Sequence, residues 1–365
     1  MEKTLKRSFV SAGTIALLYL STALPATAED TRIADLEQRV IELESEPTLN
    51  YGVDGVNLTI YGYIKADLIY DLDSDLGSTI FGLGSLEPGT ETGSNFTGQA
   101  IQSRLGVRAE FDGATAVLEG DFFGGGGGQF RLRHANLTVG NLLIGRSWTN
   151  FMPIESYPST LDFQGPSGIP FARVAQARYT YEMPNGLGFS TSVEQAASDS
   201  SDPALTAAAF YSSERYFVKL AALGTTVSTT GGDVDGWGVN LSGNAQLWEG
   251  GSINASYTTG EAVGSYMVFG GDDTFGGAAV ETDGITLGIS QTSGDWTFGA
   301  AYGLRQIDTG AATDTERLET IHLTTNYQIR ESTTIGAEYI IGDRELFNDT
   351  SVSADRLQVS AKLSF

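Results

Sequence analysis

Polar and apolar residues alternate along most of the chain from Leu58 onward, in segments of about ten to fourteen residues. In residues 98–111 one parity is apolar and includes Ile101, Leu105 and Val107, whereas the other parity is polar. Successive side chains of a strand point to opposite faces, so each segment presents one face to lipid and the other to water. Segments of this length suit tilted strands that cross a membrane.

We count sixteen such strands, at approximately 58–71, 98–111, 113–123, 128–139, 141–150, 171–183, 186–196, 204–212, 215–225, 236–248, 251–261, 282–292, 296–307, 317–330, 333–341 and 354–365. Connections after even-numbered strands are tight, as at Asp112-Gly113, and those after odd-numbered strands are long, most clearly 72–97, 151–170, 262–281 and 342–353. Short periplasmic turns and longer outer loops are typical of bacterial outer-membrane barrels. The sequence therefore predicts an all-β fold, a 16-stranded antiparallel transmembrane β-barrel over residues 58–365. A soluble β-sandwich or β-helix would also show alternation, but its loops have no reason to alternate in length.

Residues 1–28 have the features of a cleaved signal peptide. Lys3, Lys6 and Arg7 precede an apolar run that ends in Ala26-Thr27-Ala28. This combination is typical of export across the inner membrane. The alternative, a retained membrane anchor, requires about 20 apolar residues, and this run is shorter.

Residues 29–47 are predicted to form a periplasmic coiled-coil helix that Pro47 ends, followed by a linker over 48–57. The a and d positions of two heptads are Ile33, Leu36, Val40 and Leu43. This spacing is typical of a coiled-coil seam, and Ile and Val at a with Leu at d by themselves favour two strands. The alternative is a lone amphipathic helix lying on its own protein.

The overall charge and the missing cysteines exclude several classes of function. The chain has 45 acidic and 21 basic residues, a net charge of −24, and no cysteine. Nucleic acid is not an expected partner, because binding a phosphate backbone requires basic surface. Disulfides, thiolate metal sites and cysteine nucleophiles are excluded as well. The two histidines, His134 and His322, lie far apart, and no G-x-S-x-G motif is present. We therefore expect neither an enzyme nor a cofactor.

Basic residues are concentrated, relative to the rest of the chain, in residues 98–183. This segment has seven acidic residues and seven arginines, namely Arg104, Arg108, Arg131, Arg133, Arg146, Arg173 and Arg178. The rest of the chain after residue 28 has 11 basic and 37 acidic residues. Arginine pairs bidentately with carboxylates, so we expect these side chains to line a constriction that binds anions.

Strand parity indicates for some of the seven arginines, but not for all of them, whether the side chain faces the lumen or the lipid. It predicts that Arg104, Arg108 and Arg178 face the lumen, whereas a bulge in 128–150 would change the assignment of other arginines there. The alternative interpretation is that the arginines neutralise inward carboxylates, namely Glu110, Glu119 and Asp121.

The segment 151–170 is predicted to be a constriction loop that folds into the lumen. Its four prolines restrict the backbone. They would allow the loop to hold Glu155 or Asp162 opposite the arginines. A plain outer loop is the alternative. The remaining acidic loops are expected to be solvated, although they could bind divalent cations that bridge lipopolysaccharide.

Residues 131–181 and 60–71, together with the predicted coiled coil, resemble DcaP-like outer-membrane porins. This resemblance implies a homotrimer of sixteen-stranded channels with an N-terminal coiled coil, and uptake of small dicarboxylates and related anions. We therefore expect a porin in the bacterial outer membrane, in contact with its lipid and lipopolysaccharide, that admits small anionic solutes through an arginine-lined constriction. The alternatives are a general non-selective diffusion porin and a structural or adhesive barrel.

Overall fold

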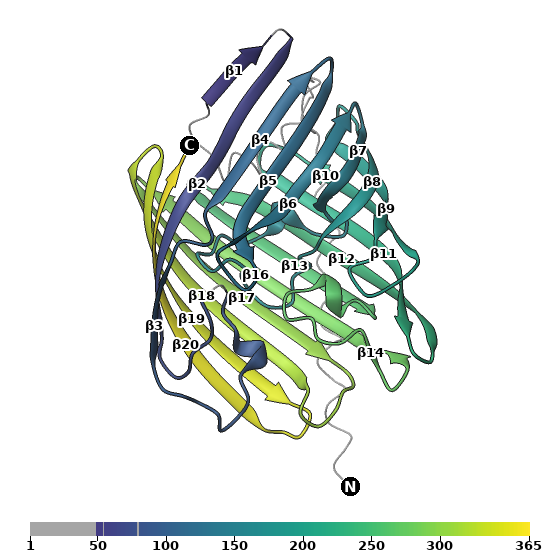
Figure 1. Cartoon of the computed structure of the whole chain (residues 1–365), viewed down its shortest axis with the longest axis vertical. Helices are drawn as coiled ribbons and strands as arrows, with labels where there is room; N and C mark the ends of the chain where they lie inside the picture. Colours follow the sequence, from purple (N-terminus) through teal and green to yellow (C-terminus); the bar gives the residue numbers. More distant parts are fainter. Residues whose placement is uncertain (1–48, 54, 79) are drawn as a thin grey trace.

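The strands form one closed antiparallel barrel in the computed structural model, which describes residues 49–53, 55–78 and 80–365 (Figure 1). In this part of the chain sixteen strands make up the wall: β2 (Val56–Asp71), β4 (Arg104–Phe111), β5 (Ala114–Gly124), β6 (Gln129–Val139), β7 (Leu142–Trp148), β8 (Arg173–Glu182), β9 (Leu187–Gln195), β10 (Pro203–Ser212), β11 (Tyr216–Thr229), β12 (Gly232–Trp248), β13 (Gly251–Glu261), β16 (Glu281–Ser293), β17 (Trp296–Ile307), β18 (Thr315–Arg330), β19 (Thr333–Leu346) and β20 (Ser351–Ser364). The predicted fold class is confirmed.

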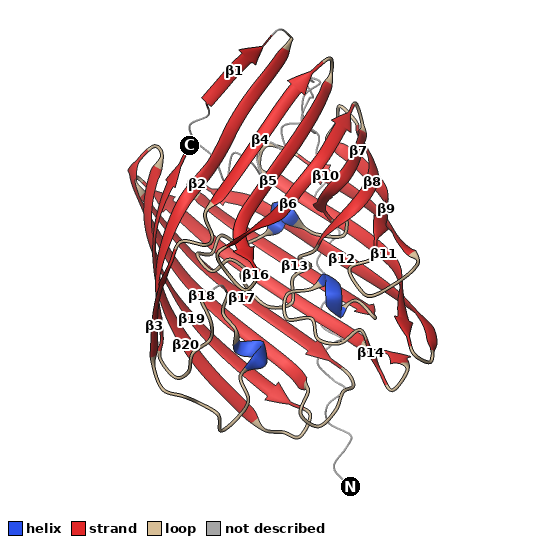
Figure 2. Ribbon diagram, viewed as in Figure 1, coloured by secondary structure: helices blue, strands red, loops and turns tan. Residues whose placement is uncertain are grey.

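The remaining elements are short. They are β1 (Leu49–Val53), β3 (Asn95–Gln99), β14 (Thr274–Phe275), β15 (Ala278–Ala279) and the 3₁₀ turns η2 (Leu83–Ser85), η3 (Ile154–Ser156) and η4 (Gly264–Tyr266) (Figure 2). β3 and β4 together occupy the predicted strand 98–111. The predicted signal peptide and coiled coil lie outside the described residues. No helix in the described ranges has the length and apolar character needed to span a membrane.

The barrel closes where β2 pairs with β20, from Tyr63 opposite Ser364 to Asp71 opposite Arg356. Gly62 and Phe365 continue the pairing through two reciprocal backbone hydrogen bonds of 3.0 Å. Closure satisfies backbone groups that would otherwise remain unpaired in lipid.

One end of the barrel has only short turns. At 112–113, Asp112 and Gly113 have φ values of 47° and 75°. Two successive positive φ values are typical of a type I′ turn, which matches the twist of the flanking strands. The opposite end has the long loops 72–94, 149–172 and 262–280.

The prediction of strictly alternating connection lengths is wrong at this opposite end. The connections 125–128, 230–231 and 347–350 are tight there. The predicted long loop 342–353 is mostly strand, because β19 continues to Leu346 and β20 begins at Ser351. Alternating burial continues through both segments.

The outer face of the wall is apolar. Ile64, Leu68 and Leu118 are each more than half exposed when lipid is absent. Exposed aromatic side chains lie close to the short turns, including Phe111, Tyr181, Tyr216, Trp248, Trp296 and Tyr327. An aromatic girdle at the edge of an apolar band is typical of membrane barrels.

The long loops fill part of the interior. In one cluster of buried residues, Phe81 and Leu83 of loop 72–94 pack with Leu318 and Ile340 of β18 and β19. In a second cluster, Tyr266 of loop 262–280 packs with Ala196, which follows β9, and with residues of β10 and β11. Residues from these two loops therefore cover two sectors of the inner wall, and neither cluster includes residues of β4, β5 or β6.

Candidate functional site

The inner face of β4, β5 and β6 has arginines that are already paired with carboxylates. Arg131 donates two hydrogen bonds to Asp121, from Nε at 2.9 Å and from Nη2 at 2.8 Å. Arg133 donates from Nε to Glu119 at 2.7 Å and from Nη1 to Asp121 at 3.2 Å. Glu119, Asp121 and Arg133 are buried. These contacts agree with the alternative in which arginines neutralise inward carboxylates.

Two arginines of β4 form similar pairs. Arg104 Nε lies 3.5 Å from Glu119 Oε1, and Arg108 Nε lies 2.9 Å from Glu110 Oε1. The Arg104–Glu119 pair is buried, whereas the Glu110 side chain is 44% exposed. Water screens the exposed pair more strongly, so Arg104 is the more tightly constrained of the two arginines.

A bulge in β6 explains why parity alone does not assign its arginines. Opposite Glu119 and Gly120 of β5, the partner on β6 changes from His134 to Leu132, which leaves Arg133 as the extra residue. Such a bulge turns neighbouring side chains toward one face. Arg133 pairs with inward carboxylates, and the His134 ring lies 5.7 Å from the Trp148 ring.

The prediction that Arg146 lines the lumen is wrong. Arg146 pairs across the sheet with Ala135 of β6 and Ala175 of β8. These residues belong to the same outward row as Ile144, which is 53% exposed. Residues of the same parity on one strand lie on the same face, so Arg146 has its Cβ on the outer face together with Ile144.

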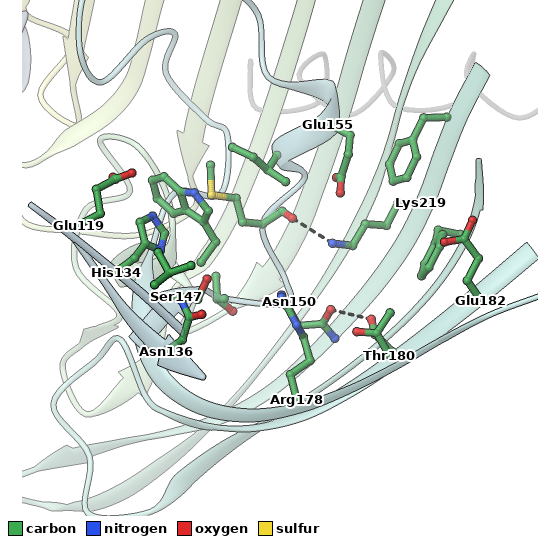
Figure 3. A pocket seen from close by; sticks show the side chains of 18 of the residues that line it. Glu119, His134, Asn136, Ser147, Asn150, Glu155, Arg178, Thr180, Glu182 and Lys219 are labelled. Carbon is green, nitrogen blue, oxygen red and sulfur yellow. Dashed lines mark hydrogen bonds between the residues drawn. The ribbon is translucent and has the colours of Figure 1, made fainter. Parts of the chain in front are cut away.

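Arg178 and Arg173 lie on β8. Arg178 pairs with Leu143 and Ser192, both buried, and lines an interior pocket together with Glu182 (Figure 3). Arg173 is the first residue of β8, opposite Trp148. Its guanidinium carbon lies 4.3 Å from the centre of a Trp148 ring and 5.7 Å from that of Phe171.

Loop 149–172 begins at a network of buried hydrogen bonds. Glu194 of β9 accepts hydrogen bonds from the Thr149 hydroxyl at 2.5 Å and the Asn150 backbone N–H at 2.8 Å. The Asn150 side chain donates to Thr206 at 2.9 Å and accepts from Ser190 at 2.6 Å. These contacts direct the loop into the barrel from its first residues.

The middle of the loop reaches the opposite wall. Glu338 of β19 accepts the backbone N–H of Leu161 at 2.6 Å and that of Asp162 at 3.1 Å. From β2, Lys65 donates to the Leu161 carbonyl at 2.8 Å. Ser167, further along, donates its backbone N–H to the hydroxyl of Thr320. The loop therefore crosses the interior and is attached to several strands.

Asp162 has a structural environment that differs from the predicted one. Its carboxylate accepts backbone hydrogen bonds from Phe81, Gln164 and Gly165. Its ion-pair contact is with Arg356 of β20, at 4.0 Å, which is not one of the seven predicted arginines. Burial raises the pKa of Asp162 above its usual range, and charges that include Arg356 oppose this shift. The prediction of Asp162 opposite the seven arginines is therefore wrong.

Glu155 lines the same pocket as Arg178, and Lys219 extends toward the loop from β11 (Figure 3). Lys219 donates from Nζ to the Met152 carbonyl at 3.0 Å. Among the acidic groups, Glu155 has the strongest charge interaction with Lys219. The pocket also has an apolar portion, formed by Tyr61, Trp148, Met152, Ile154, Phe210 and Phe217.

Sequence reasoning missed several inward charges that hold the loop, namely Lys65, Lys219, Glu338 and Arg356. Parity contained a usable signal for Lys65, Glu338 and Arg356, which lie on the more polar parity of a predicted strand, but not for Lys219, which shares its parity with Phe217 and Leu223. The sequence predicted that 151–170 enters the lumen, but it did not indicate that these four side chains would contact the loop. In the described ranges, no group of three or more His, Cys, Asp or Glu side chains is arranged to hold a metal ion.

Comparison with known proteins gives matches to outer-membrane barrels. Residues 38–276 match the family model described as DcaP outer membrane protein. The outer membrane channel DcaP of Acinetobacter baumannii is 24% identical, with a TM-score of 0.80, and the match covers 86% of this chain and 99% of that chain.

More distant structures share the architecture. OmpT, an outer membrane protein of Vibrio cholerae, is 15% identical with a TM-score of 0.60, over 87% of this chain and 99% of that chain. The Salmonella typhi OmpF complex with daunomycin is 11% identical with a TM-score of 0.57, over 87% of this chain and 100% of that chain. None of the curated proteins matches the chain. At these identities the structural likeness shows the fold alone.

Proposed function

Because the chain belongs to the DcaP outer membrane protein family, we propose that this outer-membrane porin mediates passive uptake of small organic anions, dicarboxylates among them. The observation that supports this selectivity is the meeting of loop 149–172 with the arginine-bearing wall. Arg104, Arg131, Arg133 and Arg173 lie close enough to interact through their charges. Clustered arginines at a narrow passage favour anions.

The net acidity of the protein does not contradict this proposal. Exposed charges on outer loops are screened within about 8 Å at physiological salt. Arginines beside the crossing loop would act on a solute at contact distance, where the surroundings are less polarisable. Contact interactions should therefore govern any solute small enough to reach them.

The first test is the reversal potential of channels in planar bilayers under a potassium chloride gradient. Anion selectivity, together with interruption of the current by succinate, would support the proposal. Preferential cation permeation without interruption by succinate would overturn it in favour of a general diffusion porin. That second candidate has its own support, since most of the predicted arginines are neutralised by carboxylates.

We further propose that residues 1–28 are removed on export and that residues 29–47 form a coiled coil in a homotrimer. The heptad spacing of Ile33, Leu36, Val40 and Leu43 supports the helix, and family membership supports the trimer. Deleting residues 31–46 should reduce the heat-sensitive trimer on gels. A wild-type protein that is monomeric in mild detergent would overturn the trimer.

Two functions other than a channel can be distinguished from the proposed one. An enzyme needs a nucleophile, a base and a stabilising group that converge on one site, and we expect no catalytic activity from this chain. Protein that folds in bilayers without any stepwise conductance would favour a structural or adhesive barrel.

A further inference from the structure

Arginines and aromatic rings alternate along the inner wall where the crossing loop meets β5 to β8. Three guanidinium groups each lie near two rings, and neighbouring groups share a ring. The distances from guanidinium carbon to ring centre are 5.1 Å for Arg131 to Phe123, 5.4 Å for Arg131 to Phe163, 5.4 Å for Arg133 to Phe163, 5.8 Å for Arg133 to Trp148, 4.3 Å for Arg173 to Trp148 and 5.7 Å for Arg173 to Phe171. All six lie within the range of cation–π attraction.

Arg173 differs from the other two arginines in its charge balance. Arg131 and Arg133 both donate hydrogen bonds to Asp121. In the described part of the chain, by contrast, Arg173 has no salt bridge, and its Nη1 is buried without a hydrogen-bond partner. Its strongest charge interactions are repulsive, with Arg133 first and Arg104 second. A guanidinium in such surroundings attracts an anion.

The surroundings of Arg173 also indicate the kind of anion. Its closest ring is Trp148, which lies 4.8 Å from the ring of Phe171. A guanidinium that stacks on a ring leaves its N–H edge free to bind a carboxylate with two hydrogen bonds. A flat ring attached to that carboxylate could then lie against Trp148 or Phe171.

A second, similarly uncompensated cation is not available from the neighbouring charges that the structure describes. Arg104 lies beside Glu119, and Arg108 beside Glu110. Lys219 donates to a loop carbonyl. An aliphatic dicarboxylate would therefore gain one strong contact at Arg173, and its second carboxylate would gain little.

We propose that Arg173, Trp148 and Phe171 form a binding site for the carboxylate of an aromatic anion, so that the channel prefers arene carboxylates over aliphatic anions of similar size and charge. This inference rests on the proposed anion channel and specifies its substrate class. Trp148 also lines the pocket of Figure 3, so a solute released from Arg173 enters that pocket along an aromatic surface.

The matched probes are benzoate and cyclohexanecarboxylate, which have the same charge and similar size but differ in the π-system. The wild-type channel in planar bilayers should bind benzoate about two- to five-fold more tightly, measured as the concentration that halves the current, because cation–π and aromatic contacts are modest. Equal half-blocking concentrations in the wild type would overturn the inference.

Variants separate charge from stacking. Arg173→Lys keeps a positive charge but loses the planar group, so anion selectivity should persist. Benzoate and cyclohexanecarboxylate should then halve the current at about the same concentration. Trp148→Leu should also abolish the preference. The matched control is Arg317→Lys, because Arg317 forms a surface ion pair with Glu319 on β18. This variant should retain the preference for benzoate.

A full preference for benzoate in Arg173→Lys would overturn the role of Arg173. Cation selectivity in the wild type would instead overturn the proposed function. The two failures are distinguishable because they are measured differently. The first is detected in the ratio of the half-blocking concentrations of the two anions, and the second in the reversal potential in potassium chloride. Heat-sensitive migration on gels verifies that each variant folds before it is measured.

Discussion

Glu338 of β19 accepts the backbone N–H of Leu161, 177 residues earlier in the sequence, at 2.6 Å. The same carboxylate accepts from Asp162 and from the hydroxyl of Thr324. A side chain of the far wall thus holds the middle of the crossing loop. Each acceptor that is lost from a buried N–H costs about 1–3 kcal/mol, so the loop position depends on this residue.

Glu338→Ala should release the middle of the loop and give a larger, noisier single-channel conductance. Glu338→Gln keeps one carbonyl oxygen as an acceptor and should give an intermediate conductance. Recordings in planar bilayers at fixed salt measure both. Glu345→Ala, on the same strand but nearer the loop end, is the control, and a wild-type conductance in Glu338→Ala would show that other contacts suffice.

Glu119→Gln should increase anion selectivity. Glu119 is the carboxylate beside both Arg104 and Arg133, so its neutralisation leaves two inward arginines less compensated. We expect the anion-to-cation permeability ratio to rise about two- to three-fold, because fixed charge at a narrow passage sets selectivity. The reversal potential in a salt gradient is the measurement.

Glu110→Gln is the matched control for that prediction. Its carboxylate is 44% exposed and pairs with Arg108, so screening should make its effect smaller. Breaking a buried pair can cost about 3–5 kcal/mol, and folded protein is therefore verified on gels first. An unchanged or lower permeability ratio in Glu119→Gln would contradict the assignment of these arginines to the permeation path.

Gly62→Ala should destabilise the barrel. Gly62 has a φ of 152°, and a Cβ built there would lie 2.2 Å from the backbone oxygen of Arg104. Neither backbone can move without disturbing the β2–β4 ladder, and we expect a cost of about 1–3 kcal/mol. The temperature at which the folded band disappears from a gel should fall. Gly98→Ala is the control, since its Cβ would meet only Leu68 at 3.6 Å.

Leu118→Arg should impair insertion into lipid. Leu118 is 54% exposed on the outer face of β5, and a charge on the lipid side of a barrel costs about 2–4 kcal/mol near the bilayer centre. Folding yield into lipid vesicles measures the effect, with Leu118→Ala as the apolar control. Equal yields for the two variants would mean that this position does not face the hydrocarbon.

The barrel could be predicted from the sequence because each strand repeats the same local rule. Alternating residues must satisfy lipid on one side and water on the other, so the pattern is visible strand by strand. The error at 342–353 arose because β19 and β20 continue through a segment that has the polar composition of a loop. The rule identifies strands better than it identifies their ends.

The candidate site was less predictable because it depends on contacts between distant segments. The bulge at Arg133 changes which parity of β6 faces inward, and its position could not be derived from the sequence. Asp162 finds Arg356 only because the loop crosses the barrel. Composition indicated where the arginines gather, whereas their pairing with Glu119 and Asp121 was one of two interpretations that the sequence left open.

The hydrogen-bonded seam between β2 and β20 also has a consequence for biogenesis. Arg356 and Asp71, joined across it, are 285 residues apart. The backbone of β2, the first wall strand in the chain, is therefore hydrogen-bonded on both edges only after β20, the last strand, has been synthesised. A chain released too early would expose two open sheet edges, which hydrocarbon does not tolerate. We therefore expect insertion and closure to occur together at the membrane.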